Sequence, residues 1–274
     1  MNIYWLDAPD CRDPLRVGGK AAHLGRLAAA YPVPPGFCLA AGAAPSIRYD
    51  ELAAAYARLG ERCHTPRPAV AVRSSAVDED GAQASFAGQH ASYLNVVGAD
   101  AVAAAVERCV ASAWAEHALH YRRAHGLTEE ARVAVLVQEL VVADVSAVVF
   151  SADPCTGERD RVVVNATWGL GESLVGGTVT PDLFVVRKDD LSVLSRRIAD
   201  KQCMTVATGE GTQEVAVPRC MREEPSLDAA QVEALARLAR ALERAQGWPV
   251  DLECAYRHGR LYLLQCRPIT TLVG

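Results

Sequence analysis

The sequence predicts an α+β fold arranged as two lobes. Helical and strand-like segments both occur, but the strands do not alternate regularly with helices, and this order favours α+β over a single doubly wound sheet. The chain has 274 residues, half of them hydrophobic, which is enough to bury a sizeable core in one large domain or in two lobes.

The first half of the chain is expected to open with a helix that follows a glycine turn. Residues 18–31 begin with Gly-Gly-Lys, and Leu24 and Leu27 then form an apolar face among alanines. The prolines of the sequence YPVPPGF end this helix. Similar patterns predict helices over residues 46–59 and 100–125, and strands over residues 69–72, 90–97 and 132–142.

The second half is expected to be richer in strands. Runs of β-branched residues predict strands over residues 145–150, 161–166 and 183–187. Only Ala143 and Asp144 separate the first of these from the strand before it, so a hairpin is predicted there.

The last three elements have the strongest local signals. Residues 226–247 predict a helix with Ser226 as its N-cap, Asp228 in its first turn and Gly247 as its stop. Residues 250–256 and 260–268 then predict a hairpin about His258 and Gly259.

Composition excludes several classes of protein. The net charge of −5, without a basic stripe, argues against nucleic-acid binding. The longest apolar stretch, residues 133–150, is interrupted by polar side chains, so no membrane span is expected. The first ten residues show no signal-peptide pattern. Nine scattered cysteines without a CxxC pair or zinc spacing predict reduced thiols in the cytoplasm.

Four segments contain residues suited to binding a nucleotide. In Val17–Lys20, two glycines and a lysine precede a helix, which can favour an anion. Residues 72–90 contain Arg73 followed by small residues, which let a ligand approach the backbone. Residues 168–182 form a glycine-rich stretch with an acid. The structural alternatives are a solvated lysine, a surface loop and an ordinary connection.

The fourth segment is the C-terminal hairpin. Asp251 and Glu253 are two residues apart and share one face of a strand, as do Gln265 and Arg267 across the turn. If the two faces coincide, the oxygens suit Mg²⁺ and the arginine suits phosphate. The alternative is a solvated strand face. Together the four segments indicate a site for magnesium and a nucleoside triphosphate.

The chain resembles the nucleotide-binding domain of the pyruvate phosphate dikinase and phosphoenolpyruvate synthase family, to which rifampin phosphotransferase is related by domain. The matching motifs are GGKAAHLGRL, VPPGF, VRSSAVDEDGAQASFAGQHASYLNV, VVFSADPCTGERDRVVVNATWGLGESLVGGTVTPD and LLQCRPITTL, spread over residues 15–272. The resemblance implies an ATP-grasp fold whose lobes, residues 1–137 and 138–274, clasp ATP and Mg²⁺.

The resemblance also implies roles for individual residues. Lys20 and Arg73 are similar to phosphate ligands of the family, and Gly88 and Ser92 to positions of its phosphate loop. The adenine-facing positions would be Gln138, Glu139 and Leu140.

The C-terminal hairpin would bind the metal and the end of the triphosphate. The resemblance implies magnesium ligands at Glu253 and Gln265, a γ-phosphate contact at Arg267 and a supporting partner at Asp251. Arg73 and Arg267 would be the catalytic pair.

The sequence departs from the family in the phosphate acceptor. The family charges a histidine of a swivelling domain in a TSH-type motif, and none of the seven histidines here lies in that context. The resemblance therefore implies an isolated ATP-binding unit, without the swivelling and substrate domains, that passes a phosphoryl or pyrophosphoryl group to a histidine of a separate partner protein or to a small molecule. The alternatives are a carboxylate ligase that forms an acyl phosphate, and a non-catalytic nucleotide-binding subunit.

Overall fold

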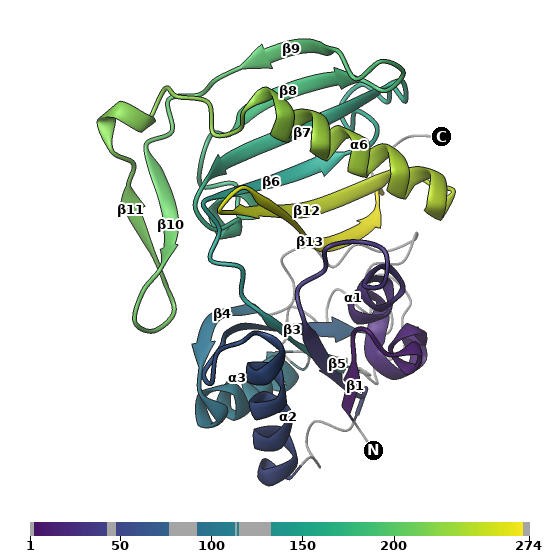
Figure 1. The fold of residues 1–274 in the computed structure, drawn as a ribbon, viewed down its shortest axis with the longest axis vertical. Coiled ribbons are helices and arrows are strands. Elements are labelled where there is room, and N and C mark those ends of the chain that lie inside the picture. Colours follow the sequence, from purple (N-terminus) through teal and green to yellow (C-terminus); the bar gives the residue numbers. More distant parts are fainter. Residues whose placement is uncertain (1–2, 43–47, 77–91, 113, 115–132, 271–274) are drawn as a thin grey trace. The chain divides into compact units, whose positions relative to one another are not determined.

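The computed structural model describes residues 3–42, 48–76, 92–112, 114 and 133–270. The chain divides into two compact units, residues 1–140 with 208–211 and residues 141–207 with 212–274. The division lies after Leu140, a few residues beyond the boundary expected from the sequence. Both units combine helices with antiparallel strands (Figure 1), so the predicted α+β class is confirmed.

The first unit is built on a five-stranded antiparallel sheet of order β1-β2-β5-β3-β4. Its strands are β1 (Ile3–Trp5), β2 (Gly36–Leu39), β3 (Ala69–Ala76), β4 (Ser92–Val97) and β5 (Val133–Glu139). The central strand β5 is apolar and buried along almost its whole length, as expected for a strand covered on both faces.

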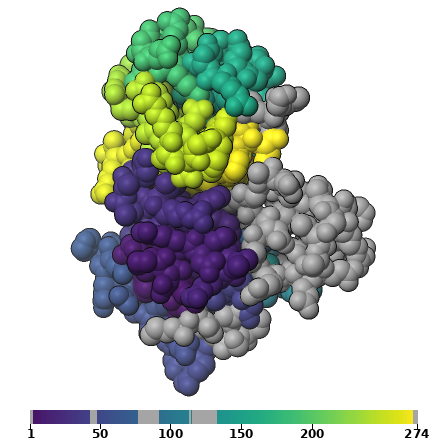
Figure 2. All heavy atoms as spheres, turned by 90° about the vertical axis from the view of Figure 1, so that its right-hand side faces the viewer, coloured from purple at the N-terminus to yellow at the C-terminus, as the bar shows by residue number. Residues whose placement is uncertain are grey.

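Helices cover both faces of this sheet (Figure 1). On one face, α1 (Pro14–Leu27), preceded by the short η1 (Pro9–Arg12), buries Val17, Leu24 and neighbouring alanines against Cys38 and Leu136. The other face is covered by α2 (Tyr49–Arg62) and α3 (Ala99–Ser112), which pack on alternate residues of the same strands. The viewer sees the outer side of α1, in dark purple, in Figure 2.

The second unit is built on a six-stranded antiparallel sheet of order β13-β12-β6-β7-β8-β9. Its strands are β6 (Val145–Phe150), β7 (Arg161–Trp168), β8 (Asp182–Arg187), β9 (Val193–Arg197), β12 (Val250–Arg257) and β13 (Arg260–Pro268). The remaining elements are α5 (Glu172–Val175), the strand pair β10 (Cys203–Ala207) and β11 (Thr212–Ala216), η3 (Arg219–Met221) and α6 (Ala229–Gln246).

Helix α6 packs across the six-stranded sheet (Figure 1). Leu235 and Leu242 of the helix and Val164 and Leu252 of the sheet are fully buried. The polar side of the helix forms part of the surface seen in yellow-green in Figure 2. This arrangement follows from the amphipathic pattern of the helix, whose leucines recur at helical spacing.

The hairpin predicted between residues 132–142 and 145–150 is wrong. Strand β5 pairs with β2 and β3, whereas β6 pairs with β7 and β12, in a different sheet. A two-residue spacing between apolar runs therefore marks the passage from one unit to the next rather than a turn.

The N-cap predicted for the last helix is also wrong. Asp228 is the N-cap: its side chain accepts from Gln231 N, and the Gln231 side chain completes a capping box. Ser226 lies further back and donates its hydroxyl to Asp182 Oδ2 at 2.7 Å. The stop at Gly247 is confirmed by its left-handed φ of 78°, and the β12–β13 hairpin turns at His258 and Gly259, both with positive φ.

Two other observations bear on the sequence expectations. None of the nine cysteines forms a disulfide, and five of them are buried. Within the parts of the chain that the structure describes, no helix is long and apolar enough to cross a membrane. The helix expected over residues 100–125 is observed as α3 up to Ser112, and residues 115–132 lie outside the described residues.

Candidate functional site

The glycine turn before Lys20 brings α1 into direct contact with β3. Gly18 interrupts the helix with φ 74° and ψ 170°, a conformation open almost only to glycine. A Cβ atom at Gly18 would lie 1.9 Å from Ser75 O. The Ser75 hydroxyl donates to Val17 O at 2.8 Å and accepts from Ala21 N at 3.1 Å. The two hydrogen bonds of Ser75 therefore hold α1 against β3 next to Lys20.

Lys20 is buried, with 7% of its surface exposed. Its Nζ donates to the carbonyl oxygen of Ser74 at 3.2 Å. A buried ammonium is costly unless it is paired and hydrogen-bonded, and the Ser74 carbonyl oxygen is one of its partners. The sequence pointed to Lys20 but not to Ser74 and Ser75, whose only signal is the pair of small hydroxyl residues after Arg73.

Arg73, Ser92 and Gln138 lie on the same face of the sheet as α1. Arg73 is directly opposite Ser92 on β4, and Ala71, two residues before it, is opposite Gln138 on β5. Alternate residues of a strand share a face, and Ser75 of this set contacts α1. The structure thus brings four of the predicted nucleotide residues onto one side of the first unit, whereas Gly88 lies outside the described residues.

Glu139 directs its side chain to the other face of this sheet. Burial, followed by the charge of Glu139 and a hydrogen bond to it, raises the pKa of the Cys63 thiol to about 12. The Leu140 N–H donates to Ala69 O at 2.8 Å. The side chain of Glu139 therefore does not join Lys20 and Arg73, and its backbone N–H donates to Pro35 O at 2.8 Å. Gln138 is held by its Nε2 donating to Pro34 O at 3.2 Å.

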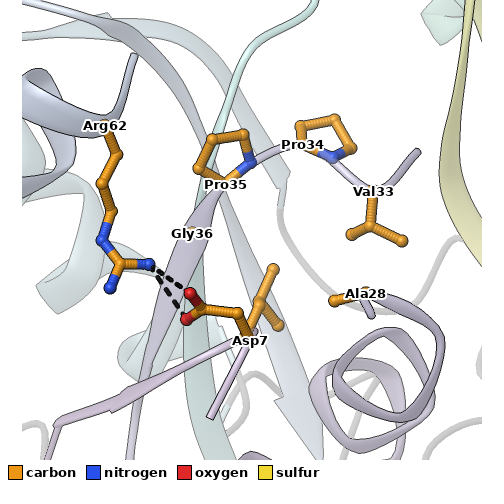
Figure 3. Close-up of a pocket in the computed structure, with 8 residues that line it drawn as sticks. Asp7, Ala28, Val33, Pro34, Pro35, Gly36 and Arg62 are labelled. Atoms are coloured by element: carbon orange, nitrogen blue, oxygen red, sulfur yellow. Dashed lines mark hydrogen bonds and ion pairs between the residues drawn. The ribbon is translucent and has the colours of Figure 1, made fainter. Parts of the chain in front are cut away.

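A pocket of about 220 Å³ lies in the first unit, beside the start of β2 (Figure 3). Its polar edge is the Asp7–Arg62 ion pair, in which Nη1 donates to both carboxylate oxygens at 2.9 Å. Its lining residues are Leu6, Asp7, Ala28, Val33, Pro34, Pro35, Gly36 and Arg62. None of the predicted site residues lines this pocket, so the pocket is distinct from the predicted nucleotide site.

The hairpin of the second unit aligns the other four residues as the sequence pattern requires. Asp251 is directly opposite Arg267, and Glu253 is directly opposite Gln265. Arg267 Nε donates to Asp251 Oδ2 at 2.8 Å. Burial raises the pKa of Asp251 above its ordinary value, and the neighbouring Arg267 acts in the opposite direction. The two predicted faces coincide, so the four side chains lie on one side of the sheet.

The residues of this hairpin fit a magnesium ion. Glu253 and Gln265 offer facing oxygen donors, and proteins hold Mg²⁺ through one or two such side chains together with phosphate oxygens and water. Asp251 Oδ1 is buried without a hydrogen-bond partner among the described residues. No group of three or more His, Cys, Asp or Glu side chains converges anywhere in that part of the chain. Phosphate oxygens would therefore have to complete the coordination.

The glycine-rich segment 168–182 ends in a structural ion pair. Asp182 is fully buried, and its Oδ1 accepts from Lys201 Nζ at 2.7 Å. Its Oδ2 accepts from both the N–H and the hydroxyl of Ser226. All these groups are satisfied within the second unit, so Asp182 is part of the core.

Known proteins resemble this chain over most of its length. The family described as "Pyruvate phosphate dikinase, AMP/ATP-binding domain" matches residues 44–273. A probable phosphoenolpyruvate synthase of Methanocaldococcus jannaschii is 35% identical and covers 98% of the chain. The phosphoenolpyruvate synthase of Pyrococcus furiosus is 40% identical over 83% of it, and a rifampicin phosphotransferase of Streptomyces sviceus is 38% identical over 93%.

The matched region is only part of each relative. The chain spans 27% of the length of the first of these proteins, 29% of the second and 34% of the third. The match over residues 44–273 includes Arg73 and Ser92, the end of β5 and the whole β12–β13 hairpin. The chain belongs to the pyruvate phosphate dikinase AMP/ATP-binding domain family.

Proposed function

We propose that this chain binds Mg-ATP and passes a phosphoryl or pyrophosphoryl group to a histidine of a partner protein or to a small molecule. The observation that carries the proposal is the β12–β13 register, which sets Glu253 against Gln265 and Asp251 against Arg267. Facing oxygen donors beside an arginine suit magnesium-bound phosphates. The relatives named phosphoenolpyruvate synthase and rifampicin phosphotransferase support phosphoryl transfer as the reaction class.

Each cluster has its own part in this proposal. Lys20 and Arg73 bind phosphate oxygens, with Ser92 beside Arg73, and Gln138 to Leu140 face the adenine. Glu253 and Gln265 hold Mg²⁺, which when bound neutralises charge on the phosphate oxygens. Arg267, oriented by Asp251, donates to the terminal phosphate and offsets the charge that develops during transfer.

The acceptor distinguishes this proposal from other reactions of the same fold. None of the seven histidines in the given sequence lies in a TSH context, so we propose a histidine outside this sequence, or a small molecule, as the acceptor. The nine cysteines form no disulfide, which is typical of a reducing compartment, and we propose the cytoplasm as the place of action.

The experiment that tests the proposal is calorimetric titration of the purified chain with ATP, with and without Mg²⁺. We expect magnesium-dependent binding that weakens in Arg73→Ala, because a charge-assisted hydrogen bond to phosphate is lost. Arg48→Ala, which removes an exposed arginine of the same unit, is the matched control and leaves the affinity unchanged. A well-folded chain that binds no ATP would overturn the proposal.

A further inference from the structure

The six-stranded sheet of the second unit has one covered face and one half-buried face. Tyr256 lies on the covered face, because its hydroxyl donates to Gln231 O of α6 at 3.1 Å. Side chains alternate along a strand, so Asp251 and Glu253 lie on the opposite face. We call this opposite face the ligand face. The register places five further residues in one row with Glu253 on this face. Gln265 lies on one side of Glu253, and Val148, Asn165, Leu183 and Arg197 follow on the other.

Asn165 is an unusual residue for its place in this row. Its cross-strand neighbours are Val148 and Leu183, and Val163 precedes it by two residues on the same face. Asparagine is depleted in strands, where β-branched and aromatic residues pack better. Asn165 is half-buried, and its side chain makes no hydrogen bond within the part of the chain that the structure describes.

A second polar group without a partner lies beside Asn165. Thr167 follows it by two residues on the ligand face, is fully buried, and its Oγ1 has no hydrogen-bond partner among the described residues. Ser146, directly opposite Thr167, donates its own hydroxyl to Gly169 O at 2.8 Å. Buried polar groups are normally satisfied, so this end of the ligand face has hydrogen-bonding capacity that the described protein groups leave unused.

The chemistry of these side chains suits a neutral hydroxyl group better than a phosphate. A carboxamide and a threonine hydroxyl each donate and accept hydrogen bonds, and neither carries charge. A sugar hydroxyl also donates and accepts, whereas a phosphate only accepts and is bound best by cations and N–H groups. Asn165 is two strands away from Glu253, a separation of about 10 Å at the usual strand spacing. That separation is comparable with the distance between the sugar and the terminal phosphates of a nucleotide.

We propose that Asn165 binds the ribose hydroxyls of the nucleotide and makes this site select ribonucleotides over deoxyribonucleotides. The inference rests on the proposed ATP site and adds its sugar-binding residue. Glu253, Gln265 and Arg267 bind the metal and phosphates at one end of the ligand face, and the Asn165 carboxamide binds the sugar across the row. Thr167 lies behind Asn165 and supplies a further hydroxyl to the same hydrogen-bond network.

The test compares the affinity of the chain for ATP with its affinity for 2′-deoxy-ATP and 3′-deoxy-ATP, each with Mg²⁺, by calorimetry. The wild-type chain is expected to prefer ATP by about 3- to 10-fold over at least one analogue, the loss that one neutral hydrogen bond produces. Asn165→Leu, which keeps the shape and removes the polar atoms, is expected to bind ATP and that analogue equally. Asn165→Ala gives the same comparison if the leucine variant does not fold.

The control is Val185→Ala, one strand further along the ligand face and half-buried. It is expected to keep the wild-type ratio. An ATP preference that survives unchanged in both Asn165 variants overturns the inference while leaving the ATP site intact. A wild-type chain that binds ATP and both analogues equally also overturns it. If the wild-type chain binds none of the three nucleotides, the proposed function itself fails.

Discussion

Arg267 depends on a buried carboxylate for its orientation. Its Nε donates to Asp251 Oδ2 at 2.8 Å, and 8% of the Asp251 side chain is exposed. The guanidinium group of an arginine has the fork geometry that suits phosphate, and Asp251 sets the orientation of this one. In the proposed site, Arg267 contacts the terminal phosphate of ATP, which ADP lacks, so this residue should determine the preference for ATP over ADP.

We predict that Arg267→Ala removes most of the preference for ATP over ADP. A hydrogen bond to a charged group contributes about 1.5–3 kcal/mol, so the ratio of the two dissociation constants should fall by about 10- to 100-fold. Calorimetric titration of both nucleotides with Mg²⁺ measures this ratio. Arg260→Ala, at the exposed turn of the same hairpin, is the control. An unchanged ratio in Arg267→Ala would show that the terminal phosphate lies elsewhere.

We also predict that Glu139→Gln lowers the pKa of the Cys63 thiol. Burial is the main cause that raises this pKa to about 12, and the Glu139 carboxylate adds to it. A raised thiol pKa means that the unfolded chain loses its proton first, so Cys63 reduces folding stability as pH rises from about 9 to about 12. In the variant, alkylation of Cys63 by iodoacetamide should reach a given rate at a lower pH. The exposed Cys155 provides the internal control, and an unshifted profile would place the carboxylate away from Cys63.

At the scale of elements, the helices and hairpins that have local sequence signals could be predicted, whereas the pairing of strands distant in sequence could not. Helix α6 and the β12–β13 hairpin depend on their own periodicity, caps and turn, so their sequence determines them. Strand β5 pairs with β2 and β3, which come from distant parts of the chain. Its closeness in sequence to β6 led to the wrong prediction of a hairpin. Strand β9 carries no buried residue and therefore left no apolar pattern to detect.

Gly18 and Gly247 allow a matched test of how α1 is held against β3. Both have positive φ, but a Cβ at Gly247 meets nothing within 4 Å, whereas one at Gly18 collides with Ser75 O. We predict that Gly247→Ala lowers the free energy of unfolding by about 1 kcal/mol. Gly18→Ala should lower it by about 3 kcal/mol or more, because backbone strain and steric overlap add. Urea unfolding measures both, and equal losses would refute the close contact.

For the whole molecule, the two halves of the candidate site were predictable to different degrees. The residues of the second unit are close in sequence and joined by a two-residue turn, so alternation predicted that each pair shares a face. The observed register then sets Glu253 opposite Gln265. In the first unit, Lys20, Arg73 and Gln138 are spread over more than a hundred residues of sequence, and sheet pairing and the packing of α1 bring them to one face of the sheet. The residue patterns already suggested Lys20 and Arg73 as parts of one site, whereas only the family resemblance indicated Gln138. Neither indicated the role of Ser75.

Whether the two clusters serve one nucleotide can be measured as a coupling free energy. If they bind the same ATP molecule, calorimetry should give one site per chain, and Arg73→Ala and Glu253→Gln should be non-additive. Each variant alone weakens binding of the same phosphates. The loss of binding free energy in the double variant should therefore be smaller than the sum of the two single losses, by more than about 0.5 kcal/mol. Lys188→Ala, which breaks an ion pair with Glu243 in the second unit, combined with Arg73→Ala is the control and should be additive. Additivity of Arg73→Ala and Glu253→Gln within that margin, or two binding events, would mean that each cluster binds its own ligand.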